Sequence, residues 1–142
     1  MQTTELYISD QKSIIDIDFV HRYLSEESYW AKGIPRELVI NSIENSLCFS
    51  AFLHEQQIGF ARVITDQATF AYLCDVFIDE AFRGKGYSKQ LMQFIMNHPA
   101  LQRVRVFALG TLDAHGLYAQ FGFLPLTTPE RRMEIRKTNP YD

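Results

Sequence analysis

The order of the predicted elements indicates an α+β fold, in which helices pack against one mixed, mostly antiparallel sheet. Three features of the chain support this class. The N-terminal segment alternates and is followed by apolar residues at helical spacing, three strand-like runs then follow one another with short polar turns, and a glycine-containing strand-to-helix junction leads to a further strand. With 142 residues the chain has the size of one domain, so residues 1–142 are predicted to form a single domain.

The first half of the chain is predicted to open with one strand and two helices before an antiparallel meander. The first helix is indicated by Ile17, Val20 and Leu24, which recur at helical spacing, and the second by Pro35, which suits a first helical turn. The expected elements are a strand at 4–9, helices at 16–24 and 36–45, and strands at 47–53, 58–64 and 70–78.

The second half is predicted to supply the crossover and the end of the sheet. A helix between two strands should make a parallel, right-handed β–α–β unit, and Asp113 is a plausible N-cap for the last helix, which Gly122 would end. The expected elements are helices at 87–97 and 113–121, strands at 104–109 and 123–126, and an optional edge strand at 133–136. The sheet would then have six to seven strands, flanked by about four helices.

Composition excludes several classes of function. The net charge is -3 with no basic stripe, which argues against nucleic acid as a partner, and no apolar run has the length of a membrane span. Cys48 and Cys74 lie in apolar, strand-like runs without metal-ligand spacing, so we expect buried thiols and no metal site. The N-terminus shows no basic region followed by an apolar stretch, so a cytoplasmic location is expected.

A loop between the strand at 70–78 and the helix at 87–97 has the character of a phosphate clamp. Two glycines allow a tight turn, so that several backbone N–H groups converge at the start of a helix, where the partial positive charge favours an anion. The P-loop spacing is absent, and Lys89 stands where a dinucleotide fingerprint needs its third glycine. The residues expected to bind the phosphate group are Arg83, Gly84, Lys85, Gly86, Tyr87, Ser88 and Lys89.

A second motif, Leu117-Tyr118-Ala119-Gln120-Phe121-Gly122-Phe123, follows about thirty residues later. Together the two motifs resemble those of the GNAT superfamily of N-acetyltransferases. Arg-x-x-Gly-x-Ser is similar to that family's acetyl-coenzyme A (acetyl-CoA) loop, Gln/Arg-x-x-Gly-x-Gly/Ala, although Ser88 departs from it at the last position. Leu-Tyr-x-x-Phe-Gly-Phe matches the other hallmark. The resemblance covers nearly the whole chain, but residues 1–57 match by element order alone.

The resemblance implies an acetyl-CoA dependent N-acetyltransferase in which the fourth and fifth strands splay apart. The pantetheine arm of the co-substrate would enter this wedge and meet backbone groups of Val76, Phe77 and Ile78. Tyr118 would act as general acid toward the leaving thiolate, although a core tyrosine with a backbone partner is the alternative. Thr111 stands where the family often has an asparagine that touches pantetheine.

The base that accepts the amine proton is left open by the sequence. Asp75 is the first candidate because a carboxylate within an apolar strand needs a role or a partner. It can equally bond to backbone or pair with Arg62 on the neighbouring strand. His115 and water are further candidates.

The acceptor is expected to be a primary amine of a small molecule. Tyr29 and Trp30 lie in the loop that roofs the acceptor pocket in the resembled family, where they can stack on the acceptor or simply cover the core, and Arg62 suits an acceptor carboxylate. Two alternatives are a non-catalytic acyl-CoA binding module and an acetyltransferase acting on protein amines. An apolar edge strand near the C-terminus leaves a homodimer open.

Overall fold

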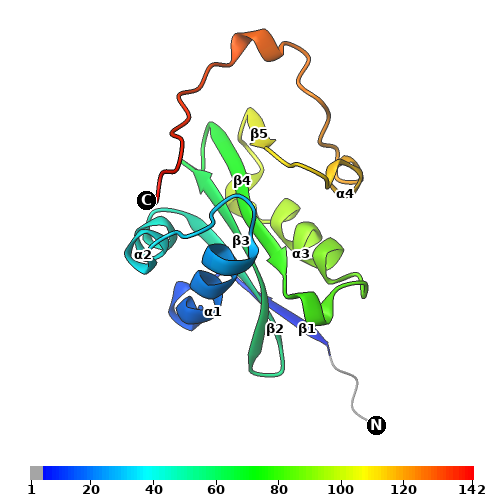
Figure 1. Cartoon of the computed structure of the whole chain (residues 1–142). Helices are drawn as coiled ribbons and strands as arrows, with labels where there is room; N and C mark the ends of the chain where they lie inside the picture. The colour runs from blue at the N-terminus through cyan, green and yellow to red at the C-terminus, as the bar shows by residue number, and fades with distance from the viewer. Residues whose placement is uncertain (1–4) are drawn as a thin grey trace.

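The computed structural model describes residues 5–142, which form one five-stranded mixed sheet with helices on both faces (Figure 1). The strands lie in the order β1-β2-β3-β4-β5; the first four pair antiparallel, and β5 runs parallel to β4. The strands are β1 (Leu6–Ser9), β2 (Leu47–Leu53), β3 (Gln56–Thr65), β4 (Phe70–Ile78) and β5 (Val106–Leu109). The predicted start of the first strand, Thr4, lies outside the described residues.

Four α-helices and several short helical turns complete the fold. In Figure 1, α1 and α2 lie on one side of the sheet and α3 on the other. The helices are α1 (Ile17–Arg22), continued by a π-helical turn at Tyr23–Glu27, α2 (Arg36–Glu44), α3 (Tyr87–Met96) and α4 (His115–Ala119). No helix among the described residues is long and apolar enough to cross a bilayer.

The sheet is buried on both faces, and successive residues of β2 serve the two sides. Phe49 packs in a cluster with Leu91 and Ile95 of α3, whereas its neighbour Cys48 packs in a cluster with Val39 and Ile43 of α2. This alternation follows from the two-residue period of a strand. It explains why β2 is apolar at every position except Ser50.

A β-bulge interrupts β4 opposite the middle of β3. Phe77 pairs with Phe60 and Cys74 pairs with Arg62, so two residues of β4 face a single residue of β3. Asp75, at the bulge, has a φ of 53°, a left-handed conformation that is uncommon for a residue other than glycine. The bulge re-aims the end of β4 relative to its neighbours.

Beyond the bulge, β4 and β5 separate. Their parallel pairing covers only Phe70–Leu73 of β4, from the pair Phe70 and Val106 to the pair Leu73 and Leu109. Residues 74–78 therefore pair with β3 on one edge, whereas β5 does not pair with them on the other edge. The expected splay of these two strands is present.

The predicted sheet of six to seven strands was wrong, because the structure has five. The segments 123–126 and 133–136 have no strand pairing among residues 5–142; Leu124 is 79% exposed, Met133 97% and Ile135 96%. The apolar residues at 123–126 and the alternation at 133–136 suggested strands, but a strand also needs a neighbour to bond with. The last helix is also shorter than predicted, and Thr111 rather than Asp113 supports its start, since the Thr111 hydroxyl accepts from the Ala114 N–H at 3.1 Å.

Candidate active site

One cavity of about 510 Å³ joins the three regions that the sequence singled out. It is bounded by the end of β4 beyond the bulge, by the glycine loop with the start of α3, and by α4. The predicted residues that line it are Tyr29, Trp30, Val76, Phe77, Ile78, Arg83, Gly84, Gly86, Tyr87, Ser88 and Tyr118. The splay of β4 and β5 creates this space, because a fully paired β5 would occupy the free edge of β4.

The glycine loop presents an uncapped helix start to this cavity. Gly84 and Gly86 have φ values of 80° and 81°, and Gly86 is the N-cap of α3 with no side chain bonded to the first turn. The first N–H groups of an α-helix have no partner within the helix, so those of Tyr87, Ser88 and Lys89 are available to an anion. Lys85 and Lys89, both exposed, add positive charge beside the loop.

The side chain of Arg83 anchors the loop from within. Its Nε donates to the carbonyl of Ile78 at 3.0 Å, and its Nη2 donates to the hydroxyl of Tyr23. Burial raises the pKa of Tyr23, and the nearby Arg83 opposes this shift. Arg83 therefore ties the loop to the end of β4 and to the helical layer. Its partner Tyr23 was not predicted from the sequence.

Tyr118 projects from α4 beside the cavity. Its side chain is buried and packs edge-to-face against Phe123, with 6.1 Å between ring centroids, and no residue of 5–142 provides a hydrogen-bond partner for its hydroxyl. Burial raises the pKa of Tyr118 to about 12, with smaller contributions from Tyr29 and Asp113. The hydroxyl therefore keeps its proton throughout the neutral range.

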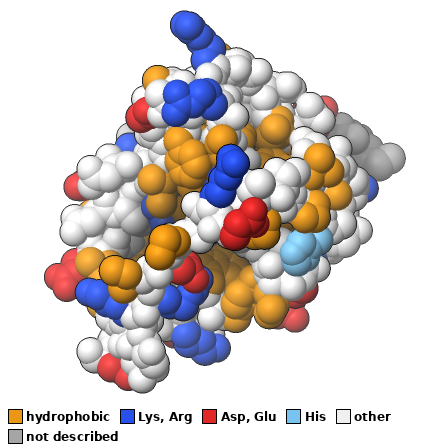
Figure 2. All heavy atoms as spheres, turned by 90° about the horizontal axis from the view of Figure 1, so that it is seen from above, with side chains coloured by type: hydrophobic (Ala, Val, Ile, Leu, Met, Phe, Trp, Pro, Cys, Tyr) orange, Lys and Arg blue, Asp and Glu red, His pale blue; other side chains and the backbone are white. Residues whose placement is uncertain are grey.

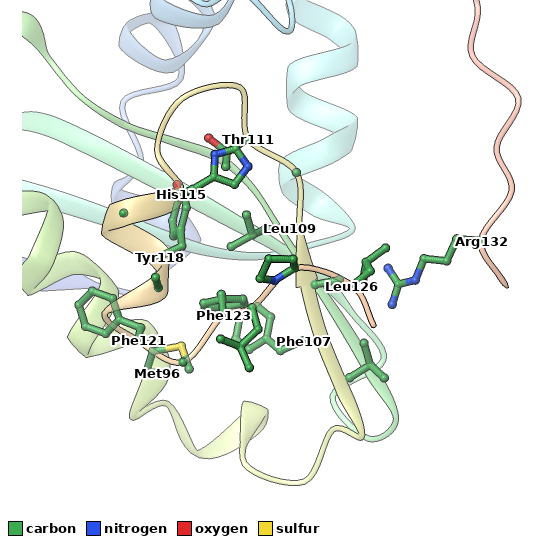
Figure 3. A pocket seen from close by; sticks show the side chains of 18 residues that line it. Met96, Phe107, Leu109, Thr111, His115, Tyr118, Phe121, Phe123, Leu126 and Arg132 are labelled. Carbon is green, nitrogen blue, oxygen red and sulfur yellow. The ribbon is translucent and has the colours of Figure 1, made fainter. Parts of the chain in front are cut away.

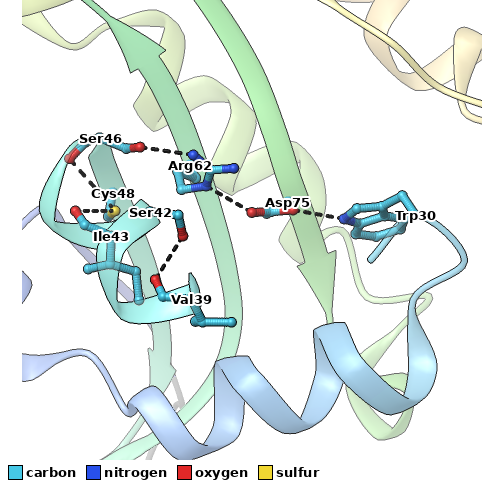
Figure 4. A network of polar contacts seen from close by, with 8 residues as sticks. All are labelled: Trp30, Val39, Ser42, Ile43, Ser46, Cys48, Arg62 and Asp75. Atoms are coloured by element: carbon cyan, nitrogen blue, oxygen red, sulfur yellow. Dashed lines mark hydrogen bonds and ion pairs between the residues drawn. The ribbon is translucent and has the colours of Figure 1, made fainter. Parts of the chain in front are cut away.

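Asp75 is held by two donors rather than left free (Figure 4). The Nε of Arg62 donates to Asp75 Oδ2 at 2.8 Å, and the indole Nε1 of Trp30 donates to Asp75 Oδ1 at 2.8 Å. Arg62 also donates from Nη1 to the hydroxyl of Ser46 at 2.9 Å. Of the two roles that the sequence left open for Asp75, the structure shows the contact with Arg62.

Two aromatic side chains close one side of the cavity. The rings of Tyr29 and Trp30 meet edge-to-face with 5.0 Å between centroids, and the Tyr29 hydroxyl accepts from the backbone N–H of Leu112 at 2.9 Å. This bond joins the loop after α1 to the loop before α4. Glu27 and Asp113 bring carboxylates to the same cavity.

The remaining predicted residues lie elsewhere. Thr111 and His115 line a different cavity, between β5, α4 and the C-terminal segment. Arg62 lies in the Asp75 network and does not line the active-site cavity.

Gly59 was not predicted as a site residue, although a glycine inside a strand is itself a sign of a close backbone approach. A Cβ at Gly59 would lie 2.6 Å from Ile78 Cδ1 and 2.9 Å from the Phe77 carbonyl.

Comparison with known proteins assigns the fold. The family described as Acetyltransferase (GNAT) family matches residues 17–123, which include both motifs. The chain belongs to the GNAT acetyltransferase family. It is an N-acetyltransferase, and enzymes of this family use acetyl-CoA as co-substrate.

Individual relatives agree with this assignment. A GNAT family protein from Xanthomonas campestris pv. campestris is 48% identical in sequence to this chain. Its crystal structure superposes with a TM-score of 0.95, and the match covers 99% of each chain. A Gibberella zeae protein whose name describes an acetyltransferase is 24% identical over 77% of this chain and 75% of its own length. A probable acetyltransferase from methicillin-resistant Staphylococcus aureus, 22% identical with a TM-score of 0.76 over 94% of this chain and all of that one, shares the fold.

The similarity to the Xanthomonas protein extends to the C-terminal segment. Residues 123–142 make up more than a tenth of the chain. A TM-score of 0.95 over 99% of both chains therefore requires this segment to follow a similar path in that crystal structure.

Proposed function

We propose that this N-acetyltransferase transfers the acetyl group of acetyl-CoA to a primary amine of a small molecule by direct attack, with Tyr118 as general acid. The observation that carries the proposal is the single cavity that contains the uncapped start of α3, the free edge of β4 and the side chain of Tyr118. These are the groups that an acyl thioester needs: an anion site, a site for its carbonyl and a proton donor.

The glycine loop fits the pyrophosphate of acetyl-CoA. Both loop glycines adopt positive φ values and leave open space where a Cβ would stand, so a ligand can approach the backbone closely. The N–H groups of residues 84–89 would bind the phosphate oxygens, and Lys85 and Lys89 would add charge. Arg83 acts differently, because its bonds to Ile78 and Tyr23 hold the loop in place.

The thioester tail would lie along the free edge of β4. Val76, Phe77 and Ile78 line the cavity at the position where β5 has separated. The Ile78 carbonyl accepts from Arg83, but the other backbone groups on this edge have no strand beside them among residues 5–142 and can bond with a ligand. A backbone N–H aimed at the thioester carbonyl stabilises the negative charge that develops during attack. Asp75 acts as a positioning residue, because its bonds to Arg62 and Trp30 fix the bulge from which this edge begins.

The chemical step needs one proton donor and one outlet for a proton. An amine bound as its cation first loses one proton through water, because an alkylammonium has no free electron pair with which to attack. The neutral nitrogen then forms a bond to the carbonyl carbon, the carbon–sulfur bond breaks, and the departing thiolate takes the hydroxyl proton of Tyr118. The second proton lost by the nitrogen leaves through water toward Asp113, a carboxylate that lines the cavity. Tyr118 recovers its proton from water, since its pKa of about 12 favours the neutral form.

The acceptor end of the cavity suits a compact cationic amine. Tyr29 and Trp30 offer aromatic surfaces, and the carboxylates of Glu27 and Asp113 attract positive charge. Arg62 does not line this cavity, which disfavours the earlier expectation that it binds an acceptor carboxylate.

The test is thiol release from acetyl-CoA with a panel of polyamines, amino acids, arylalkylamines, aminoglycosides and lysine-containing peptides. We expect turnover with one of the small amines, and Tyr118→Phe should lower kcat about 100-fold or more, the usual contribution of a general acid, with little change in CoA affinity. Tyr7→Phe, a change at an exposed tyrosine of β1, is the matched control. Turnover confined to the peptides would refute the small-molecule acceptor, and an unchanged kcat in Tyr118→Phe would refute the role of Tyr118.

A further inference from the structure

Two aromatic side chains form a corner at the acceptor end of the active-site cavity. The rings of Tyr29 and Trp30 meet at an angle of 83°, and both residues line the cavity. They are 56% and 40% exposed, so the rest of residues 5–142 leaves much of their surface open. Because the face of an aromatic ring carries partial negative charge, two rings at a right angle provide two walls of a cage for an ammonium group.

Hydrogen bonds at their polar atoms hold both rings in place. Trp30 Nε1 donates to Asp75 Oδ1 at 2.8 Å, and the Tyr29 hydroxyl accepts from the N–H of Leu112 at 2.9 Å. Ser28, which precedes them, is buried, and its hydroxyl bonds to the backbone on both sides. The corner is therefore formed before a ligand arrives, and little ordering of these side chains is needed on binding.

The charges around the corner favour a cation. The carboxylates of Glu27 and Asp113 line the same cavity, and neither forms an ion pair within residues 5–142. Of the described residues that line it, Arg83 is the one with a basic side chain, and that guanidinium is already bound to other groups of the protein. On the face shown in Figure 2, acidic side chains lie among hydrophobic ones. Such surroundings suit a ligand that joins positive charge to an apolar body.

The larger cavity on the other side of α4 lacks this charge pattern. Its volume is about 820 Å³, and Tyr118 lines both cavities. The described residues around the larger one include Arg132 and His115 but no aspartate or glutamate (Figure 3). We therefore expect a cationic acceptor to approach Tyr118 from the side of Glu27 and Tyr29.

The two carboxylates of the active-site cavity act at different positions. Burial raises the pKa of Tyr118, and Asp113 is close enough to add to this rise. Burial likewise raises the pKa of Tyr23, and there the added contribution of a cavity carboxylate comes from Glu27. Asp113 thus lies beside the general acid, whereas Glu27 lies toward the turn that follows α1.

The reacting nitrogen itself is poorly suited to the aromatic corner. It must lose a proton before it can attack the thioester, and ring faces and a carboxylate that favour the cation would oppose that loss. A group that keeps its charge throughout the reaction gains from the same contacts at every step. The corner therefore suits a second cationic group, while the reacting amine lies beside Tyr118.

We propose that Tyr29, Trp30 and Glu27 form a subsite for a second cationic group of the acceptor, one that stays charged while the primary amine is acetylated. The acceptor is then an amine with two positive charges on a short apolar spacer. This inference rests on the proposed function, since the primary amine must still reach the thioester beside Tyr118. Trp30 and Glu27 determine specificity in this arrangement and take no part in the chemical step.

Tryptophan fluorescence tests the subsite without any reaction. Trp30 is the only tryptophan of the chain, so its emission reports on the corner directly. We expect tetramethylammonium to change this emission in a saturable way, whereas neutral tert-butyl alcohol, of similar shape, and sodium chloride at the same concentration should not. Glu27→Gln should weaken tetramethylammonium binding about 3-fold. Glu26→Gln, at an exposed neighbour that does not line the cavity, is the matched control. No response to tetramethylammonium, or an equal response to the alcohol, overturns the proposal.

A pair of acceptors tests whether the subsite selects the substrate. Aminopropyl-trimethylammonium is a primary amine with a permanent second charge, and carbon in place of its quaternary nitrogen gives a neutral isostere. The two free amines differ in basicity, so the ratio of their kcat/KM values is compared between proteins, where that difference cancels. Relative to wild type and Glu26→Gln, we expect the ratio of charged to neutral acceptor to fall about 10-fold in Trp30→Leu and about 3-fold in Glu27→Gln.

The neutral isostere separates recognition of charge from structural damage. If loss of the bond between Trp30 and Asp75 only disturbs the bulge, both acceptors slow together and their ratio does not change. An unchanged ratio in Trp30→Leu and Glu27→Gln therefore refutes the subsite. Saturable binding of tetramethylammonium without turnover of either amine would refute the proposed transfer to small amines and leave the subsite in place, so the two failures are distinguishable.

Discussion

Asp75 and Arg62 form a buried ion pair across β3 and β4, with 2.8 Å between Asp75 Oδ2 and Arg62 Nε and side-chain exposures of 9% and 15%. The pair sits at the bulge that redirects β4. A left-handed backbone conformation at an aspartate costs of order 1 kcal/mol, so the surrounding bonds must hold it. Its contact with Trp30 also connects the bulge to the loop that closes the active-site cavity.

Replacement of Asp75 by Asn should destabilise the protein by about 3 kcal/mol, because it leaves the guanidinium of Arg62 buried without its counter-charge. Urea unfolding measures the loss. Asp18→Asn is the control. Asp18 also forms an ion pair with an arginine, with 3.0 Å between Asp18 Oδ1 and Arg36 Nε, but both of these side chains are largely exposed. That control should cost less than about 1 kcal/mol. Equal losses in the two variants would contradict a special role for the pair at the bulge.

Replacement of Gly59 by Ala should disturb the same region from the side of β3. The added Cβ would lie 2.6 Å from Ile78 Cδ1 and 2.9 Å from the backbone oxygen of Phe77, and the backbone oxygen cannot rotate away. We expect a loss of about 1 to 3 kcal/mol, typical of overpacking, together with weaker CoA binding because the end of β4 must shift. Thermal unfolding and CoA titration measure the two effects. Normal CoA affinity in a destabilised variant would show that the edge of β4 does not contact the ligand.

The parts of the site that could be predicted are those in which the local sequence dictates the geometry. Gly84 and Gly86 adopt the positive φ values that only glycine adopts at little cost, and Gly122, with a φ of 95°, follows the last helix as expected. The Tyr118 helix was predicted from a contiguous motif. Such signals need no knowledge of distant contacts.

The parts that could not be predicted depend on contacts between distant residues. The bond from Trp30 to Asp75 spans 45 positions, so the sequence could name both residues as candidates but could not join them. The pattern at 133–136 likewise shows that one face is suited to burial, but not which edge, if any, receives it. The strand count failed for this reason, since alternation predicts a strand and says nothing of its partner.

Replacement of Gly86 by Ala should weaken CoA binding through the backbone alone. No atom lies within 4 Å of the position of the new Cβ, so the cost comes from the φ of 81°, about 1 to 2 kcal/mol for a residue with a side chain. The loop would relax and its N–H groups would lose their convergence. Gly116→Ala is the control: it also has open space around its Cβ but lies in α4, where Ala should stabilise by about 0.5 to 1 kcal/mol. Calorimetric titration measures the CoA affinity of both variants. Equal affinities for Gly86→Ala and Gly116→Ala would contradict the proposed anion site.

The raised pKa of Tyr118 makes a prediction about stability at alkaline pH. A tyrosine titrates near pH 10 when unfolded, whereas burial raises the pKa of Tyr118 to about 12 in the fold. Between these values the folded chain holds a proton that the unfolded chain has lost, so stability should fall as pH rises, by about 1.4 kcal/mol per unit from this group. Cys48 and Cys74 add to the fall, because burial raises their pKa values to about 11 and 12.

The experiment therefore compares wild type with Tyr118→Phe, because the contributions of the two thiols cancel in the difference between them. The difference in unfolding free energy between them should be constant from pH 7 to 9 and should shift in favour of Tyr118→Phe above about pH 10. A difference that stays constant to pH 11 would mean that the Tyr118 hydroxyl is solvated and titrates as in the unfolded chain.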